Sequence, residues 1–195
     1  MGKSFRIGIA VASILLCFCH AGLSATSAPL NATTTDVAAV YHAFLDQWFG
    51  HERSVVLVAR SAEPASSNDV AQFGQCSVDP ADQHARWVDT VATKNLEKIL
   101  GDLPNLRFVD PNSWQPDDPG KRIAKGQPVD SAVATGVGHA LLTLSAITFN
   151  DAHDRAAFTF SSVCGSLCGT GGTVIFKKTD KGWVRQESTC GNWIS

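Results

Sequence analysis

The last third of the chain restricts its possible folds most strongly, because four short apolar and β-branched runs follow one another there. The runs cover residues 140–149, 155–163, 173–178 and 182–188. Such runs are typical of β-strands, and the polar stretches NDAHD and TDKG between them are typical of tight turns. Phe158 and Phe160 alternate with polar residues, as in a sheet with one buried face. We therefore predict an antiparallel β-meander of about four strands.

The first of these runs does not keep a single alternation. Leu142 and Leu144 share one parity, whereas Ile147 and Phe149 share the other. Either a β-bulge or burial of both faces would produce this change, and the residues leave both explanations open.

An amphipathic helix is predicted near the start of the ordered chain, because apolar residues recur there three and four positions apart up to Trp48. Thr35 and Asp36 suit its N-cap, and Gly50 its end. We further predict a buried strand over 54–59, an exposed excursion over 61–82, a helix over about 85–100 and mostly loop over 105–130. The expected fold is α+β, with the N-terminal helix packed on one face of the C-terminal meander.

The first residues have the composition of a secretory signal peptide. Lys3 and Arg6 precede an apolar run from Ile7 to Cys19, and small residues follow. We expect a signal peptide over 1–25, a flexible leader over 26–35 and a single α+β domain over 36–195. The apolar run is too short to span a bilayer, so no membrane span is expected after cleavage. The predicted location is exported, either periplasmic or secreted.

The charge balance predicts that the protein does not bind nucleic acid. Without Lys3 and Arg6 the chain keeps 14 basic against 18 acidic residues, a net charge of −4, and it has no basic run. No Gly-x-Ser-x-Gly, no His-Glu-x-x-His and no P-loop motif occurs. We therefore assign no catalytic residue, cofactor or metal, and expect an accessory or binding protein with an envelope or extracellular partner.

Four cysteines remain after the predicted cleavage, namely Cys76, Cys164, Cys168 and Cys190. An exported chain favours their oxidation, and the residues alone leave all three pairings open. The strand directions place Cys190 at the same end of the sheet as Cys164 and Cys168. The stretch VCGSLCGTGG also holds a group of loop glycines, which we expect to supply positive φ angles for a sharp turn: Gly165, Gly169, Gly171 and Gly172.

Two chemical alternatives compete with a structural role for this stretch. Cys164 and Cys168 could form a redox dithiol, although their spacing is one residue longer than in Cys-x-x-Cys motifs. They could also bind copper or zinc together with Cys190 and a histidine. A third alternative, an anion held by the glycine backbone, lacks the lysine and the following helix of a phosphate loop.

The segments SAITFN, CGSLCGTGG, KGWV and WIS together resemble the C-terminal signature of a group of uncharacterised exported bacterial proteins. The resemblance is specific over about 145–195 and also includes the segments VYHAFLDQWF and SVVLVARS near the start of the mature chain, whereas the middle is only loosely comparable. It implies a fold and an exported location but no reaction. Cys76 and Cys190 lie outside the signature, which implies that they pair with each other and leave Cys164 for Cys168. In the chain-entropy estimate the first bridge stabilises by nearly 5 kcal/mol and the second by about 2 kcal/mol.

Overall fold

A computed structural model describes residues 33–49, 55–188, 190 and 192–195 of the chain. The predicted signal peptide and most of the predicted leader lie outside these residues. Where the description begins, a helix starts at Thr34 and so includes the last two positions assigned to the leader. In the described part of the chain, no helix combines the length and the apolar character that a membrane crossing requires.

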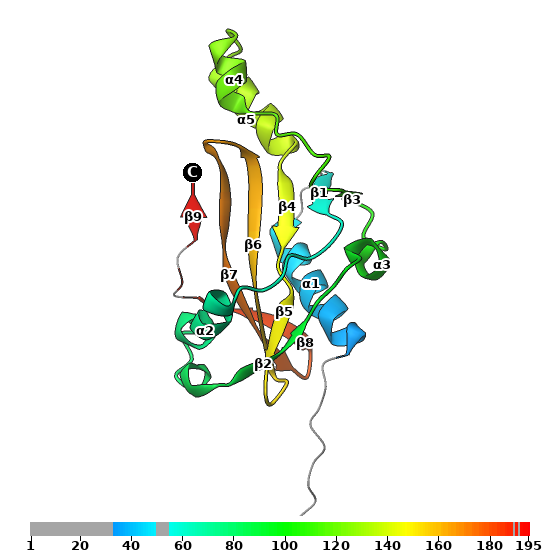
Figure 1. The fold of residues 1–195 in the computed structure, drawn as a ribbon, viewed down its shortest axis with the longest axis vertical. Helices are drawn as coiled ribbons and strands as arrows, with labels where there is room; N and C mark the ends of the chain where they lie inside the picture. The colour runs from blue at the N-terminus through cyan, green and yellow to red at the C-terminus, as the bar shows by residue number, and fades with distance from the viewer. Residues whose placement is uncertain (1–32, 50–54, 189, 191) are drawn as a thin grey trace, which may run out of the picture.

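The described residues form a mixed α+β structure, which confirms the predicted fold class (Figure 1). The helices are α1 (Thr34–Phe49), α2 (Ser67–Cys76), the short 3-10 helix η1 (Asp82–His84), α3 (Leu96–Leu100), α4 (Pro119–Ala124) and α5 (Val129–Gly138). The strands are β1 (Val56–Ala59), β2 (Trp87–Val91), β3 (Leu106–Val109), β4 (Leu141–Leu144), β5 (Ile147–Asn150), β6 (Arg155–Gly165), β7 (Cys168–Thr179), β8 (Gly182–Gln186) and β9 (Trp193–Ile194).

All nine strands belong to one sheet built around the long hairpin of β6 and β7. On one side of β6, β4 pairs with its C-terminal part and β5 with its N-terminal part. The sheet continues from β4 to β1 and β3, and from β5 to β2. On the free side of β7, β8 pairs with its C-terminal half and β9 with its N-terminal part. The predicted strands of the last third are therefore present, but they form only part of a larger sheet that also includes β1, β2 and β3 from earlier in the chain.

A β-bulge separates β4 from β5 and explains the change of parity in the first run. Leu144 lies opposite Phe160, but Thr148 lies opposite Ala157, so the β4–β5 side holds one extra residue. At this point the backbone N–H of Ala146 turns away from β6 and donates to the carbonyl of Glu63, 2.6 Å away. Burial of both faces applies as well, since every residue of β5 is buried.

Apolar side chains pack on both faces of the sheet. The larger core lies between α1 and one face; Tyr41 and Phe44 make edge-to-face contacts with Phe158, and the Tyr41 hydroxyl donates to the carbonyl of Ser145 at 2.7 Å. A smaller cluster covers the opposite face beside α2, away from the Cys-Gly end of the sheet: Phe73, Cys76, Ala157 and Ile175. Trp183 of β8 is 8% exposed and belongs to the larger core.

The predicted helix over 85–100 is wrong. Residues 87–91 form β2, with alternating burial, and only Leu96–Leu100 is helical, after Asn95 accepts a hydrogen bond from the N–H of Lys98 at 3.1 Å. The apolar residues of this segment do not alternate, since Val88 is exposed and Asp89 lies on the more buried side; pairing with β5 makes the segment a strand.

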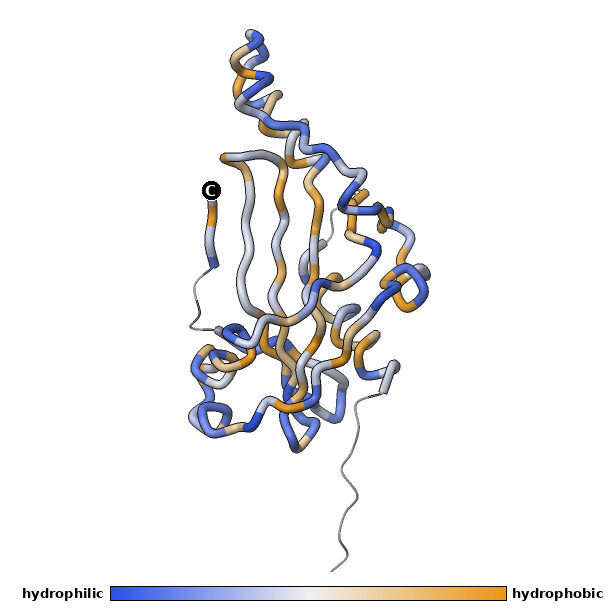
Figure 2. Tube along the Cα trace, viewed as in Figure 1, coloured by the Kyte–Doolittle hydropathy of each residue, from blue (hydrophilic) through white to orange (hydrophobic). Residues whose placement is uncertain are grey.

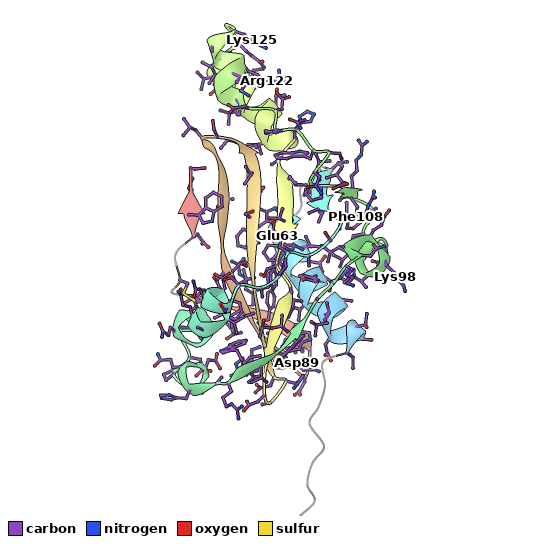
Figure 3. All side chains as sticks on the ribbon, in the orientation of Figure 1. Glu63, Asp89, Lys98, Phe108, Arg122 and Lys125 are labelled. Carbon is purple, nitrogen blue, oxygen red and sulfur yellow. A yellow bond between two sulfur atoms is a disulfide. The ribbon has the colours of Figure 1, made fainter. Side chains whose placement is uncertain are left out.

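Two segments predicted as irregular are more ordered than expected. The excursion 61–82 contains α2, which begins where Ser66 accepts from the N–H of Asp69 at 3.0 Å and buries Phe73 against the sheet. The segment 105–130 contains β3, α4 and the first residues of α5. Arg122 of α4 and Lys125, just after α4, mark the short helices that extend beyond the Cys-Gly end of the sheet (Figure 3).

Candidate functional site

The structure joins Cys76 to Cys190 and Cys164 to Cys168, with Cα atoms 4.7 and 5.2 Å apart. These are the pairs that the family resemblance implies. The second bridge closes the β6–β7 hairpin, whose turn consists of Ser166 and Leu167. Because both loop cysteines are joined to each other, neither presents a thiolate for redox chemistry or for a metal in this state.

Cys190 does not lie at the Cys-Gly end of the sheet, so this prediction is wrong. It packs beside Phe73, Cys76 and Ile175, at the level of the smaller core. The strand β9, which begins three positions later, pairs with Gly171. The first bridge therefore fastens α2 to the segment that leads into β9.

The loop glycines do not serve the purpose that the sequence suggested. Within the described residues, positive φ angles among glycines occur at Gly126 and Gly182, not at Gly165, Gly169, Gly171 or Gly172. The four are extended strand residues, and what they provide is space. A Cβ atom on Gly171 would lie 2.5 Å from Nε1 of Trp193, and a Cβ on Gly169 would lie 3.1 Å from the same ring.

Trp193 consequently lies over the backbone of β7, in contact with Gly169 and Gly171, and a Cβ atom on Gly171 would displace the ring. Its strand β9 pairs Trp193 with Gly171 and Ile194 with Thr170, and Ser195 exchanges two backbone hydrogen bonds with Gly169. The side chain is 43% exposed, so much of the indole faces solvent. The ring therefore forms an aromatic surface beside the sheet.

The registers of the strands place this ring at the end of a row of small polar residues. Thr143 of β4 lies opposite Ser161 of β6, Ser161 opposite Gly171, and Gly171 opposite Trp193. Residues that face each other across a ladder share a face of the sheet. A second row contains Thr159 opposite Thr173, so hydroxyl groups from three strands lie on this face above the smaller core.

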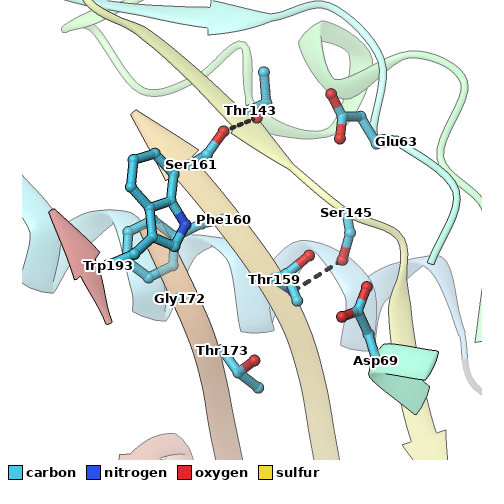
Figure 4. Close-up of a pocket in the computed structure, with 10 residues that line it drawn as sticks. All are labelled: Glu63, Asp69, Thr143, Ser145, Thr159, Phe160, Ser161, Gly172, Thr173 and Trp193. Carbon is cyan, nitrogen blue, oxygen red and sulfur yellow. Dashed lines mark hydrogen bonds between the residues drawn. The ribbon is translucent and has the colours of Figure 1, made fainter. Parts of the chain in front are cut away.

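The two rows line a polar trough of about 300 Å³ (Figure 4). Glu63 and Asp69 stand on the side opposite Trp193. The trough is lined by the following residues: Glu63, Asp69, Thr143, Ser145, Thr159, Phe160, Ser161, Gly172, Thr173 and Trp193. No lysine, arginine or histidine is among them.

Part of the hydrogen-bonding capacity of the trough is used within the protein. The hydroxyls of Thr143 and Ser161 lie 2.7 Å apart, and the Ser145 hydroxyl accepts from the N–H of Thr159 at 2.9 Å. The Asp69 carboxylate accepts from the hydroxyl of Ser66 at the N-cap of α2. Each hydroxyl still has unused lone pairs, and each carboxylate accepts further bonds. The site can therefore bind hydroxyl donors, and its acceptors disfavour an anion.

The N-cap residue of α4, Asp118, forms hydrogen bonds with the turn of the β6–β7 hairpin. Asp118 accepts from the N–H and the hydroxyl of Ser166, at 3.2 and 2.9 Å, and from the N–H of Gly120 at 2.8 Å. These hydrogen bonds, those from Ser166 first, hold the pKa of Asp118 below its ordinary value. The fit is close, because a Cβ atom on Gly165 would lie 2.9 Å from the Asp118 carboxyl carbon.

Sequence reasoning missed the trough, although one signal was present. Thr159 and Ser161 alternate with buried phenylalanines, which indicates a polar face on this strand, but nothing local shows that Trp193 lies across the glycines. Within the described ranges, no group of three or more His, Cys, Asp or Glu side chains is placed to hold a metal ion.

A comparison of the chain with known protein families, characterised proteins and solved structures finds no match. The resemblance to exported bacterial proteins accordingly stays a prediction.

Proposed function

We propose that this chain is an exported, disulfide-stabilised binding protein, and that the polar trough binds a neutral saccharide. The observation that carries the proposal is the indole of Trp193 lying over Gly169 and Gly171 at the end of a row of hydroxyls. A saccharide has apolar C–H faces that pack on an aromatic ring and hydroxyl edges that need hydrogen-bonding partners. The trough offers both within one concave surface.

The charge of the trough supports this ligand class over others. Of the described residues that line it, two are carboxylates and none is a cation, so phosphorylated or carboxylated ligands would be repelled. The hydroxyls of Ser161, Thr159 and Thr173 come from paired strands, whose positions are fixed by ladder hydrogen bonds. A site built on strands requires little ordering when the ligand binds, which favours recognition of a weakly binding neutral ligand.

The test is titration of the purified protein with a panel of soluble neutral oligosaccharides, including tri-N-acetylchitotriose and maltotriose, followed by calorimetry. Trp193→Ala should weaken the affinity for the oligosaccharide that binds best by about tenfold, which corresponds to 1.4 kcal/mol. The matched control is Ile194→Ala, because Ile194 is the next residue of β9, is 86% exposed and does not line the trough. If no oligosaccharide binds, or if both variants lose affinity equally, the saccharide site is refuted.

Export needs a separate measurement. We expect the full chain, expressed in a bacterium, to accumulate outside the cytoplasm with its N-terminus close to residue 26, as mass spectrometry of the intact protein would show. The bulk of the signal peptide's hydrophobic residues, Ile7 to Cys19, would then be absent from the purified protein. An uncleaved chain recovered from the cytoplasm would contradict this part of the proposal without affecting the saccharide test.

A further inference from the structure

Exposed apolar side chains gather at the Cys-Gly end of the molecule, on the face opposite the polar trough. Leu167 at the hairpin turn is 85% exposed and Ile194 is 86% exposed. Val133 and Val137 of α5 are 42 and 58% exposed, one helical turn apart. The hairpin turn and β9 both carry hydrophobic colour at this end (Figure 2). Scattered apolar residues need no explanation, but a gathering of this kind marks a binding surface.

These residues surround an apolar groove of about 740 Å³. The strand registers explain which residues form its base. Ser162 lies opposite Thr170, and Thr170 lies opposite Ile194. On each strand these residues are next to the residues of the trough row. Because successive residues of a strand point to opposite faces, the row of Ser162, Thr170 and Ile194 faces the α1 side. Trp48 of α1, which packs edge-on against Phe160, closes the groove toward the larger core.

We propose that this groove binds a single aliphatic chain, in the form of a free fatty acid. Among the described residues that line it, no side chain is charged, and half are valine, alanine, leucine or isoleucine. The volume lies within the range of small-ligand pockets, about 300–1,000 Å³. A folded partner would instead need about 800 Å² of complementary surface, whereas this feature is a hollow of about 740 Å³. The hydroxyls of Ser162 and Thr170 are available to the carboxyl group. This ligand is distinct from the saccharide of the proposed function.

Gly138 provides a direct way to close the groove. It lines the groove at the end of α5, has no positive φ angle, and a Cβ added there would have no atom within 4 Å. A large side chain at this position should therefore fill the groove without disturbing the backbone. Gly138→Trp is the blocking variant, and Gly138→Ala is its matched control.

The experiment measures binding of dansylated undecanoic acid to the purified protein by fluorescence, and its displacement by palmitic acid. We expect binding by the unmodified protein, nearly unchanged affinity for Gly138→Ala, and at least a tenfold loss for Gly138→Trp. Ile194→Ala should also weaken binding severalfold, whereas Trp193→Ala should not, which reverses their order in the saccharide test. The melting temperature of each variant is measured in parallel, so that a folding defect is recognised.

Three results would overturn the inference. The first is the absence of any saturable fatty-acid binding, as expected if the chain itself fills the groove. The second is adsorption to phosphatidylglycerol vesicles without binding of monomeric fatty acid, which would indicate a membrane contact. The third is a dimer in gel filtration that Gly138→Trp dissociates, which would assign the groove to a second copy. None of these results bears on the saccharide site.

Discussion

Removing the bridge between Cys76 and Cys190 should destabilise the protein far more than removing the bridge between Cys164 and Cys168. The first pair is 114 positions apart and the second pair 4. The chain-entropy relation gives about 4.8 kcal/mol for the long loop and about 2 kcal/mol for the short one at 25 °C. A domain of this size has about 5–15 kcal/mol of stability in total, so loss of the long bridge would remove a third or more of it.

The assay is guanidinium unfolding of two double variants, Cys76→Ala/Cys190→Ala and Cys164→Ala/Cys168→Ala, followed by circular dichroism and tryptophan fluorescence. Alanine prevents thiol exchange, so each variant retains one intact bridge. We expect a difference of about 3 kcal/mol between the variants in the extrapolated free energy of unfolding. Equal losses, or a larger loss for the hairpin variant, would refute the reasoning, because they would show that the long loop is already restricted in the unfolded chain.

Three further perturbations test other contacts. Gly171→Ala would bring a Cβ within 2.7 Å of the carbonyl of Phe160 and against the Trp193 ring, so we expect about 1–3 kcal/mol of destabilisation by calorimetry and loss of saccharide binding. Arg155→Met should lower the free energy of unfolding in urea by about 3–5 kcal/mol, because Asp82, which lies 2.7 Å from the guanidinium Nε, would remain buried without its cation. Adding Asp82→Asn to this variant should partly restore stability. The pKa of Asp118 is depressed, so the hydrogen bonds that it accepts from Ser166 are fully present above the ordinary pKa of 3.8 and are lost as pH falls through the lower pKa of the folded state. The NMR chemical shift of the Ser166 amide should follow that titration, and Asp118→Asn should abolish the titration.

Local patterns predicted the strands of the last third because hairpins are short-range structures. The β6–β7 and β7–β8 connections follow directly from the polar and glycine-rich residues between the runs. The strands β1 and β3 are joined in parallel, and their pairing depends on segments far apart in the chain. No local pattern encodes such pairing. The helix α2 was missed for a related reason, since its order depends on burial of Phe73 against the sheet and not on propensity.

The candidate site shows the same division between local and distant information. That Thr159 and Ser161 share a polar face could be deduced from alternation alone. The function of Gly169 and Gly171 could not, because a glycine that relieves a turn and a glycine that accommodates a ring look identical in sequence. The difference lies in the pairing of β7 with β9, which brings Trp193 to Gly171 from 22 positions away.

The long bridge connects the stability of the fold to both proposed ligand surfaces. The strand β9 contributes Trp193 to the trough and Ile194 to the groove, yet it is two residues long and is held to β7 mainly by backbone pairing around Gly169–Gly171. Two paired residues are too few to hold a strand in place on their own. Cys190 lies three positions before Trp193 and is tied to the buried Cys76, so the bridge restricts where β9 can lie. The bridge that limits the unfolded chain thus also positions two adjacent residues on opposite faces of the sheet, where each lines one of the two proposed ligand surfaces.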